Sequence, residues 1–196
     1  MSLTFVLTGE AHLQQEVRKS RFLAHAKPID DVDAALAFVG GIGERDATHH
    51  CWAYRIGALY RFNDDGEPAG TAGKPILQAI DSQNVDGVVV VVTRWFGGIK
   101  LGAGGLARAY GGCAAECLRR AAKRPKVALA VVRVRCDFAS AAALHAWLRD
   151  HAGIKSDERF LEDGVELELE LPEAEVPALI ERVRDLTRGR GQVVAA

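Results

Sequence analysis

Residues that could bind a ligand or do chemistry are concentrated in three stretches between residues 48 and 110. Residues 48–51 read THHC and place two histidines side by side. Residues 64–75 read DDGEPAGTAGKP, and residues 93–110 read TRWFGGIKLGAGGLARAY. Clustered carboxylates and imidazoles can hold metal ions, and a glycine-rich segment with neighbouring cations can bind anions. Each stretch therefore supports a chemical hypothesis and a structural alternative.

The glycine-rich stretch predicts an anion site at the start of a helix. Its glycines leave the backbone bare between an expected strand and an expected helix, so that N–H groups can converge on a phosphate with help from nearby cations. The alternative is that the glycines only permit tight turns and close helix packing. The predicted anion-binding or nucleic-acid-binding residues are Arg94, Trp95, Gly97, Gly98, Lys100, Gly102, Gly104, Gly105 and Arg108.

Two known phosphate motifs do not account for this stretch. Residues 102–107 fit GxGxxA, but the motif begins nine residues after Thr93 and no acidic residue closes a following strand about 20 residues later. The stretch also lacks the GKS or GKT of a P-loop. Dinucleotide binding is therefore rejected on spacing.

The carboxylates Asp64, Asp65 and Glu67 allow two interpretations. They can form an Asx turn that organises a loop through its own backbone N–H groups. They can also hold Mg²⁺ that bridges to a phosphate, which makes magnesium the one possible cofactor that we predict. The remaining residues of this predicted signature loop are Gly66, Gly70, Thr71, Gly73 and Lys74.

The histidines and cysteines favour a structural interpretation. His49 and His50 precede a strand, where neighbouring side chains point to opposite faces, so at most one can join a given site. Zinc would need a histidine to meet Cys113 and Cys117 across the fold, and these cysteines fit better as apolar core residues.

Trp95 and Phe96 follow Arg94 and could stack on bases, as aromatic and cationic neighbours do in single-strand binders. Strand alternation should turn one of the two rings inward. No nucleophile elbow or comparable triad is present, so no catalytic residue is predicted.

Composition gives a weak bias in charge between the two parts of the chain. The 196 residues have a net charge of −1, with 16 Lys and Arg against 13 Asp and Glu in residues 1–126 and 9 against 13 in residues 127–196. Between Arg94 and Lys126 eight basic residues face Glu116 alone, which predicts a local basic surface. The alternative for residues 119–126 is that cations at a helix end offset its dipole.

Cysteine usage and hydropathy predict a cytoplasmic protein. The four cysteines form no CxxC pair, and the N-terminus shows no cleavable leader. No apolar run approaches the roughly 20 residues needed to cross a bilayer, so no membrane partner is expected.

Hydrophobic periodicity places these stretches on an α+β framework of two domains, residues 1–126 and 127–196, separated at the sequence KRPK. In the first domain we expect strands at 3–7 and 21–26 that pair, a helix capped by Asp30 or Asp31, a hairpin of 51–56 and 58–62, a short helix around 75–80, a strand at 88–92 buried on both faces, and a helix at 105–121.

The second domain is expected to follow a βαββαβ order, which is the ferredoxin-like arrangement. The expected elements are strands 129–136, 154–160, 165–171 and 192–195 and helices 141–151 and 174–187. Strand 165–171 alternates Val and Leu with Glu, which predicts one buried face and one acidic, wet face.

The second and third stretches resemble the signature of the IMPACT/YigZ family, DDGEPxGTAGxPIL followed by TRYFGGxKLGxGGLxRAY, with Trp95 where Tyr is usual. The sequence KSRF at residues 19–22 matches a third family block. The resemblance implies a first domain similar to the second domain of small-subunit ribosomal protein S-five and a ferredoxin-like second domain similar to the last domain of elongation factor G. It also implies a link to translation and its regulation, in eukaryotic members through binding a regulator of a stress kinase.

The leading hypothesis is a cytosolic binding protein of the translation apparatus, without catalytic activity, whose first domain contacts RNA, a nucleotide or phosphate, or a ribosome-associated protein. One alternative is a metal-assisted phosphate-handling hydrolase or transferase that uses Asp64, Asp65 and Glu67. The other is a protein-interaction module whose acidic strand in the second domain docks a basic partner or regulates the first.

Overall fold

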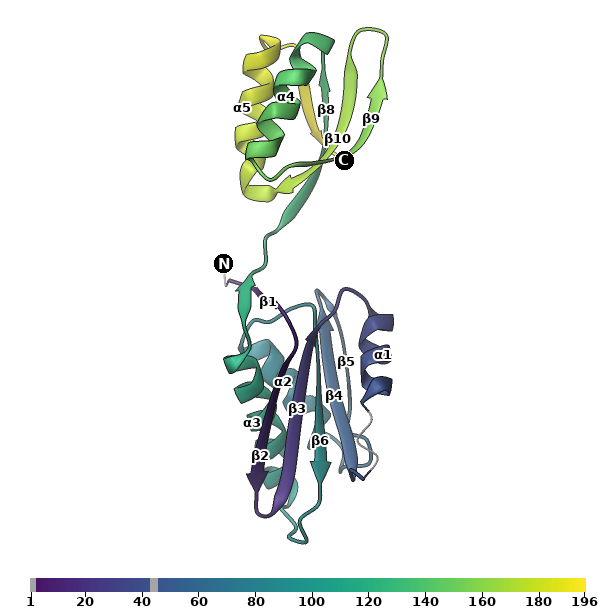
Figure 1. Cartoon of the computed structure of the whole chain (residues 1–196), viewed down its shortest axis with the longest axis vertical. Helices are drawn as coiled ribbons and strands as arrows, with labels where there is room; N and C mark the ends of the chain where they lie inside the picture. Colours follow the sequence, from purple (N-terminus) through teal and green to yellow (C-terminus); the bar gives the residue numbers. More distant parts are fainter. Residues whose placement is uncertain (1–2, 43–45) are drawn as a thin grey trace. The chain divides into compact units, whose positions relative to one another are not determined.

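The computed structural model describes residues 3–42 and 46–196 (Figure 1). The chain divides into two compact units, residues 1–126 and 127–196. Of the helices in these described ranges, none combines the length and the apolar character that a membrane span needs.

The first unit is built on a five-stranded antiparallel sheet with the strand order β2-β3-β6-β4-β5. Its strands are β2 (Ala11–Val17), β3 (Ser20–Pro28), β4 (His49–Ile56), β5 (Leu59–Asn63) and β6 (Val88–Trp95). The valines of β6 are fully buried, as predicted, because this strand is central and both faces of the sheet are covered there. The predicted hairpin is confirmed as β4 and β5.

Three helices cover this sheet. Helices α2 (Gly73–Ser82) and α3 (Ala103–Arg120) pack on one face, and α1 (Val32–Gly41) packs on part of the other (Figure 1). The Asp31 side chain caps α1 by accepting the Ala34 N–H at 2.7 Å, as predicted. Cys113 and Cys117 lie in the core under α3, which confirms their interpretation as core residues. Burial raises the pKa of these thiols to about 12 and about 11, so they remain protonated and unreactive.

The expected pairing of residues 3–7 with 21–26 is wrong. Strand β1 (Phe5–Leu7) pairs instead with β7 (Lys123–Pro125), and β3 pairs with β2, a strand that we did not predict. Strand β2 escaped notice because one of its inward positions is the polar Gln15. The Gln15 side chain donates to the Ala109 carbonyl oxygen at 3.1 Å, which satisfies it against α3.

The second unit has the predicted βαββαβ order in an antiparallel sheet, β11-β8-β10-β9. Its elements are β8 (Leu129–Cys136), α4 (Phe138–Asp150), β9 (Ile154–Phe160), β10 (Val165–Pro172), a 3-10 turn (Glu173–Glu175), α5 (Val176–Thr187) and β11 (Gln192–Ala195). Helix α4 begins earlier than expected because Asp137 caps it and accepts the Ser140 N–H at 2.8 Å.

Strand β10 buries its apolar residues as predicted, but its other face is not simply acidic. Its glutamates are half-buried, and Glu166 and Glu168 lie opposite Arg135 and Arg133 of β8. Glu168 forms an ion pair with Arg133 at 3.3 Å. Part of the charge of this strand is therefore balanced within its own sheet, which weakens the prediction of a docking site for a basic partner.

Candidate functional site

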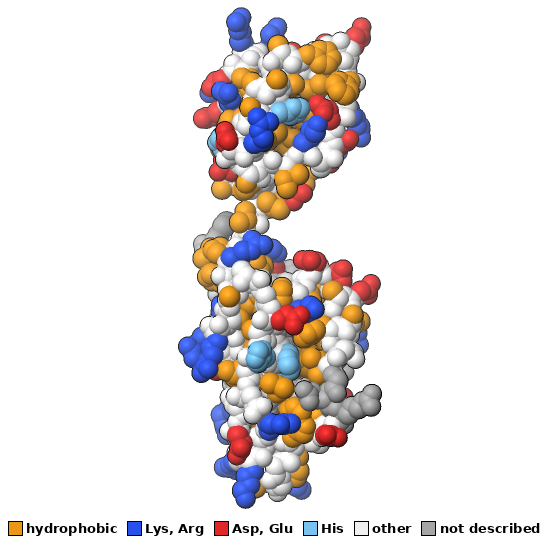
Figure 2. Space-filling view, in the orientation of Figure 1, with side chains coloured by type: hydrophobic (Ala, Val, Ile, Leu, Met, Phe, Trp, Pro, Cys, Tyr) orange, Lys and Arg blue, Asp and Glu red, His pale blue; other side chains and the backbone are white. Residues whose placement is uncertain are grey.

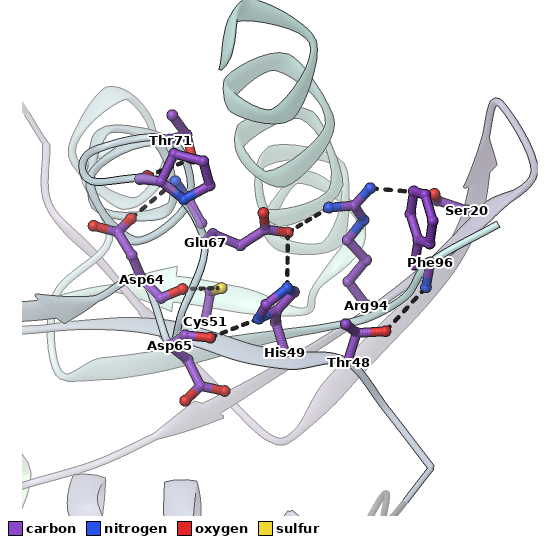
Figure 3. Close-up of polar contacts among 12 residues, drawn as sticks. Ser20, Thr48, His49, Cys51, Asp64, Asp65, Glu67, Thr71, Arg94 and Phe96 are labelled. Carbon is purple, nitrogen blue, oxygen red and sulfur yellow. Dashed lines mark hydrogen bonds and ion pairs between the residues drawn. The ribbon is translucent and has the colours of Figure 1, made fainter. Parts of the chain in front are cut away.

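A buried ion pair joins two of the three stretches (Figure 3). Arg94 on β6 and Glu67 in the loop between β5 and α2 are 5% and 8% exposed, and Arg94 Nη1 lies 2.5 Å from Glu67 Oε1. The Tyr110 hydroxyl of α3 donates to the same oxygen at 2.7 Å. Because buried charges must be paired and hydrogen-bonded, this carboxylate and this guanidinium depend on each other.

His49 joins this network, and His50 does not. His49 Nδ1 lies 2.7 Å from the Asp65 carbonyl oxygen, so Nδ1 carries the hydrogen, and Nε2 faces Glu67 Oε1 at 3.8 Å (Figure 3). His50 points to the other sheet face, where its Nδ1 lies 3.1 Å from Thr93 Oγ1. The structure thus brings one histidine to the site, as strand alternation predicted.

The signature loop is organised by Asp64. Its carboxylate accepts the N–H groups of Gly70, Ala72 and Gly73 at 2.9, 3.0 and 2.8 Å. Within the loop, Thr71 is buried and its hydroxyl donates to the Pro68 carbonyl oxygen at 2.6 Å. This is the loop-organising role that the sequence offered as the structural alternative.

The magnesium site considered from the sequence is not formed by these carboxylates. Asp64 binds backbone amides of its own loop, and Asp65 accepts the His50 N–H at 2.6 Å. Glu67 is bound to Arg94. Each carboxylate thus has separate partners, and across residues 3–42 and 46–196 no three His, Cys, Asp or Glu side chains are grouped so as to hold a metal ion.

The remaining loop residues have structural positions. Gly66 and Gly70 adopt positive φ angles of 81° and 75°, which favour glycine. A Cβ on Gly73 would lie 2.7 Å from the Asn63 carbonyl oxygen. Lys74 is exposed in the first turn of α2.

Cys51 and Tyr110 are poor nucleophiles beside this network. Burial raises the pKa of the Cys51 thiol to about 12 and also raises the pKa of Tyr110. The Cys51 thiol donates to the Asp64 carbonyl oxygen at 2.9 Å. Both groups therefore act as protonated hydrogen-bond donors.

Three glycines of the predicted anion site have structural roles. A Cβ on Gly97 would come within 1.9 Å of the Lys19 carbonyl oxygen, and the Gly97 N–H donates to Ser20 Oγ at 3.2 Å. Gly98 and Gly102 hold φ angles of 84° and 72° in turns. Three glycines thus serve close packing and chain reversal, which was the structural alternative.

Arg94 is the clearest correction, since its side chain points into the interior. Trp95 is half-buried with the Arg21 guanidinium 3.7 Å from its ring centre, and Phe96 is the ring that is exposed. The start of α3, which includes Gly104 and Gly105, has no side-chain cap, and anion binding there stays a prediction.

The basic surface predicted between Arg94 and Lys126 is also wrong as a single surface. Arg119 and Arg120 pair with Glu116, and Lys126 pairs with Asp86. These cations are neutralised by partners in their own neighbourhood.

Exposed cations gather instead at the end of the sheet where β2 turns into β3 (Figure 2). Within the described part of the chain, no salt bridge joins Arg18, Lys19, Arg21, Lys100 or Arg108 to another residue. The contact of Gly97 with Lys19, and a cavity of about 400 Å³ lined by both Arg18 and Arg108, show that the three segments that carry them are adjacent. We call this group the basic end; it consists of Arg18, Lys19, Arg21, Lys100 and Arg108.

Comparison with known proteins follows the same division of the chain. A family model described as "Impact N-terminal domain" matches residues 18–118, and one described as "Domain of unknown function (DUF1949)" matches residues 134–190. The chain belongs to the IMPACT family. This IMPACT family member is 49% identical over 175 residues to "IMPACT family member in pol 5'region" of Thermus thermophilus, covering 89% of this chain and 97% of that protein.

Two other relatives and one solved structure extend the match. "IMPACT family member YigZ" of Escherichia coli (strain K12) is 38% identical over 190 residues, 92% of each chain. "Protein IMPACT" of Rattus norvegicus is 39% identical over 95 residues, which are 43% of this chain and 29% of that protein. A solved structure titled "Crystal structure of an hypothetical protein" has a TM-score of 0.77 and 34% identity, covering 100% of this chain and 98% of that one.

In this IMPACT family member, the signature residues mainly build the interior network. Glu67, Arg94 and Tyr110 all come from the two signature blocks, whereas Arg18 and Lys19 come from the turn before the KSRF phenylalanine. Sequence reasoning missed Arg18, Lys19 and Arg21 as site residues. The signal that could have found them is a pair of polar residues between two alternating segments, which indicates a two-residue hairpin turn.

Proposed function

We propose that the first unit binds RNA through the basic end, as a cytosolic protein linked to translation or its regulation. The observation that carries the proposal is the gathering of exposed, unpaired cations from three chain segments at one end of the sheet. Only Glu16 adds an acidic side chain on the adjoining strand β2, so the local charge is strongly positive. A phosphate chain is the ligand that such a surface attracts.

The turn that carries two of these cations supports a binding role. Arg18 and Lys19 form the two-residue turn between β2 and β3, and their φ angles are 46° and 66°. Such turns favour Asn-Gly, because non-glycine residues in this region are strained. Two long cationic side chains at strained positions are better explained by binding than by folding.

Neighbouring groups extend the surface. The uncapped start of α3 adds the partial positive charge of a helix N-terminus beside Lys100. Trp95, with Arg21 stacked on it, and the exposed Phe96 offer aromatic faces of the kind that bases stack on. The family resemblance implies that the first domain is similar to a domain of ribosomal protein S-five and the second to a domain of elongation factor G, which supports a link to translation.

The proposed function is binding without a chemical step. Arg18 and Lys19 take the phosphate-binding role predicted for Arg94.

Binding of the full chain to a single-stranded RNA should be measured as a function of salt. Replacing Arg18 with Asn and Lys19 with Gly removes two cations and relieves the turn. We expect this double variant to be more stable than the wild type. The slope of log K against log salt should become shallower by about 1.4, because each of the two lost phosphate contacts contributes about 0.7. Lost binding in this variant could not be attributed to unfolding.

A matched control removes two exposed cations outside the basic end, by Arg124→Ala and Arg149→Ala. The control should keep the wild-type slope. Equal slopes in the control and the turn variant, or an affinity that does not change with salt, would refute the proposal. Binding only to a ribosome-associated protein would assign the same surface to a protein partner.

A further inference from the structure

A cavity of about 280 Å³ opens beside the basic end, above the buried ion pair. Its walls are formed by Pro68, Phe96, Leu101 and Leu106, and Glu67 and Arg94 also line it. Lys100 lines the cavity as well and belongs to the basic end, so the two features are contiguous. We call it the Phe96 cavity. Resting on the proposed function, we propose that the Phe96 cavity holds one unstacked base of the bound RNA.

The aromatic wall is held in place for stacking. Phe96 is 48% exposed, its backbone N–H donates to Thr48 Oγ1 at 3.1 Å, and its ring centre lies 5.5 Å from the Arg94 guanidinium carbon. An exposed ring beside a guanidinium and fixed by its backbone is a stacking platform, and stacking on such platforms tolerates any base.

Glu67, one of the polar residues that line the cavity, has one acceptor that no described residue uses. The polar contacts of the Glu67 side chain, with Arg94, Tyr110 and His49, all go to Oε1, and the other carboxylate oxygen points away from them (Figure 3). Glu67 is 8% exposed, and a buried acceptor without a partner is unfavourable. A ligand that brings an N–H donor is therefore favoured here.

These features select a class of ligand. A free acceptor is complementary to an N–H donor, which every RNA base carries on its edge. A peptide amide also offers an N–H donor, but it lacks the flat ring that suits Phe96 and the phosphate that suits Lys100. The volume is just below the roughly 300 Å³ at which sites for larger ligands begin, so one ring system fits.

The first test uses mononucleotides on the full chain, followed by NMR. Millimolar AMP and CMP should shift the resonances of Phe96, Ala103 and Leu106, and ribose 5-phosphate should leave them unchanged. Equal shifts with ribose 5-phosphate would show phosphate binding alone and overturn the proposal. Displacement of AMP by N-acetyl-leucinamide at equal concentration would assign the cavity to peptides and also overturn it.

The second test compares an RNA oligonucleotide with the same strand made abasic. Intact RNA should bind about tenfold more tightly, which is within the range for one stacked base. Ala103→Leu, at an exposed helix position lining the cavity, should abolish this difference and leave the salt slope unchanged. Ala37→Leu, at an exposed position of α1, is the matched control and should change neither.

The outcomes separate the two proposals. Steep salt dependence with no preference for intact RNA, or with a preference that Ala103→Leu preserves, would overturn the cavity proposal and keep the basic end. An affinity independent of salt would refute the basic end, and the cavity proposal falls with it.

Discussion

Replacing Arg94 with methionine should destabilise the first unit by about 3 to 5 kcal/mol, the cost of leaving a buried charge without its partner. Glu67 would keep the Tyr110 hydroxyl at 2.7 Å and His49 at 3.8 Å, but it would lose the guanidinium at 2.5 Å. At 8% exposure, Glu67 cannot recover this loss from water. Methionine nearly matches the length and volume of the arginine stem, so little of the effect comes from packing.

The double variant Glu67→Leu, Arg94→Met shows whether the two side chains act as a pair. Removing both charges leaves no uncompensated ion, although the Tyr110 hydroxyl loses its acceptor. The double variant should therefore be more stable than the sum of the single effects by at least about 2 kcal/mol, as expected for residues in one network.

Urea unfolding followed by tryptophan fluorescence measures these free energies. A Trp147→Phe background leaves Trp52 and Trp95, so the signal comes from the first unit alone. Arg55→Met is the matched control, because the Arg55–Asp81 pair has the same 2.5 Å distance but is 25% and 41% exposed. It should cost less than about 1 kcal/mol. Additive single effects in the Glu67–Arg94 cycle would refute the argument that the network is cooperative.

Two further predictions concern packing and pH. Gly97→Ala should destabilise the first unit by about 1 to 3 kcal/mol because its Cβ would overlap the Lys19 carbonyl oxygen, whereas Gly104→Ala, in the first turn of α3, should be neutral or stabilising in the same urea assay. Burial raises the pKa of Asp86, but hydrogen bonds from Lys126 and two backbone amides outweigh it and hold that pKa below the usual value. A depressed carboxylate pKa stabilises the fold above the unfolded pKa of about 3.9, and this effect is lost as the pH falls through the folded pKa. In unfolding experiments, Asp86→Asn should therefore be more destabilising at pH 7 than at pH 2.

Much of the fold was predictable because its strands and helices have clear hydrophobic periodicity and N-cap residues. The valines of β6 and the alternating Val and Leu of β10 indicated their strands directly, and Asp31 marked the start of α1. Strand β2 was missed because Gln15 occupies an inward position, and its hydrogen bond to α3 exists only in the folded unit. The pairing of β1 with β7 joins the two ends of the unit and leaves no local signal.

The site was predictable in its members but not in its arrangement. The two signature blocks contain Glu67, Arg94 and Tyr110, yet nothing in their spacing shows that three side chains from different elements meet at one carboxylate oxygen. The role of Asp64 was accessible, because its bonds go to amides within nine residues in the chain. Local contacts could thus be read from the sequence, and contacts between elements could not.

The burial of Arg94 could have been predicted from the sequence, although its partner could not. It follows Val88, Val90 and Val92 at alternate positions of β6, so its side chain points to the same face, under α2 and α3. An arginine on a buried face requires a buried carboxylate and cannot bind a ligand as a surface cation. Its partner lies 27 residues away, and only the fold identifies it. Because Arg94 is neutralised internally, the proposed recognition of negative charge depends on exposed cations instead. Two of these, Arg18 and Lys19, lie in the β2–β3 turn at strained positions where folding alone would favour Asn-Gly.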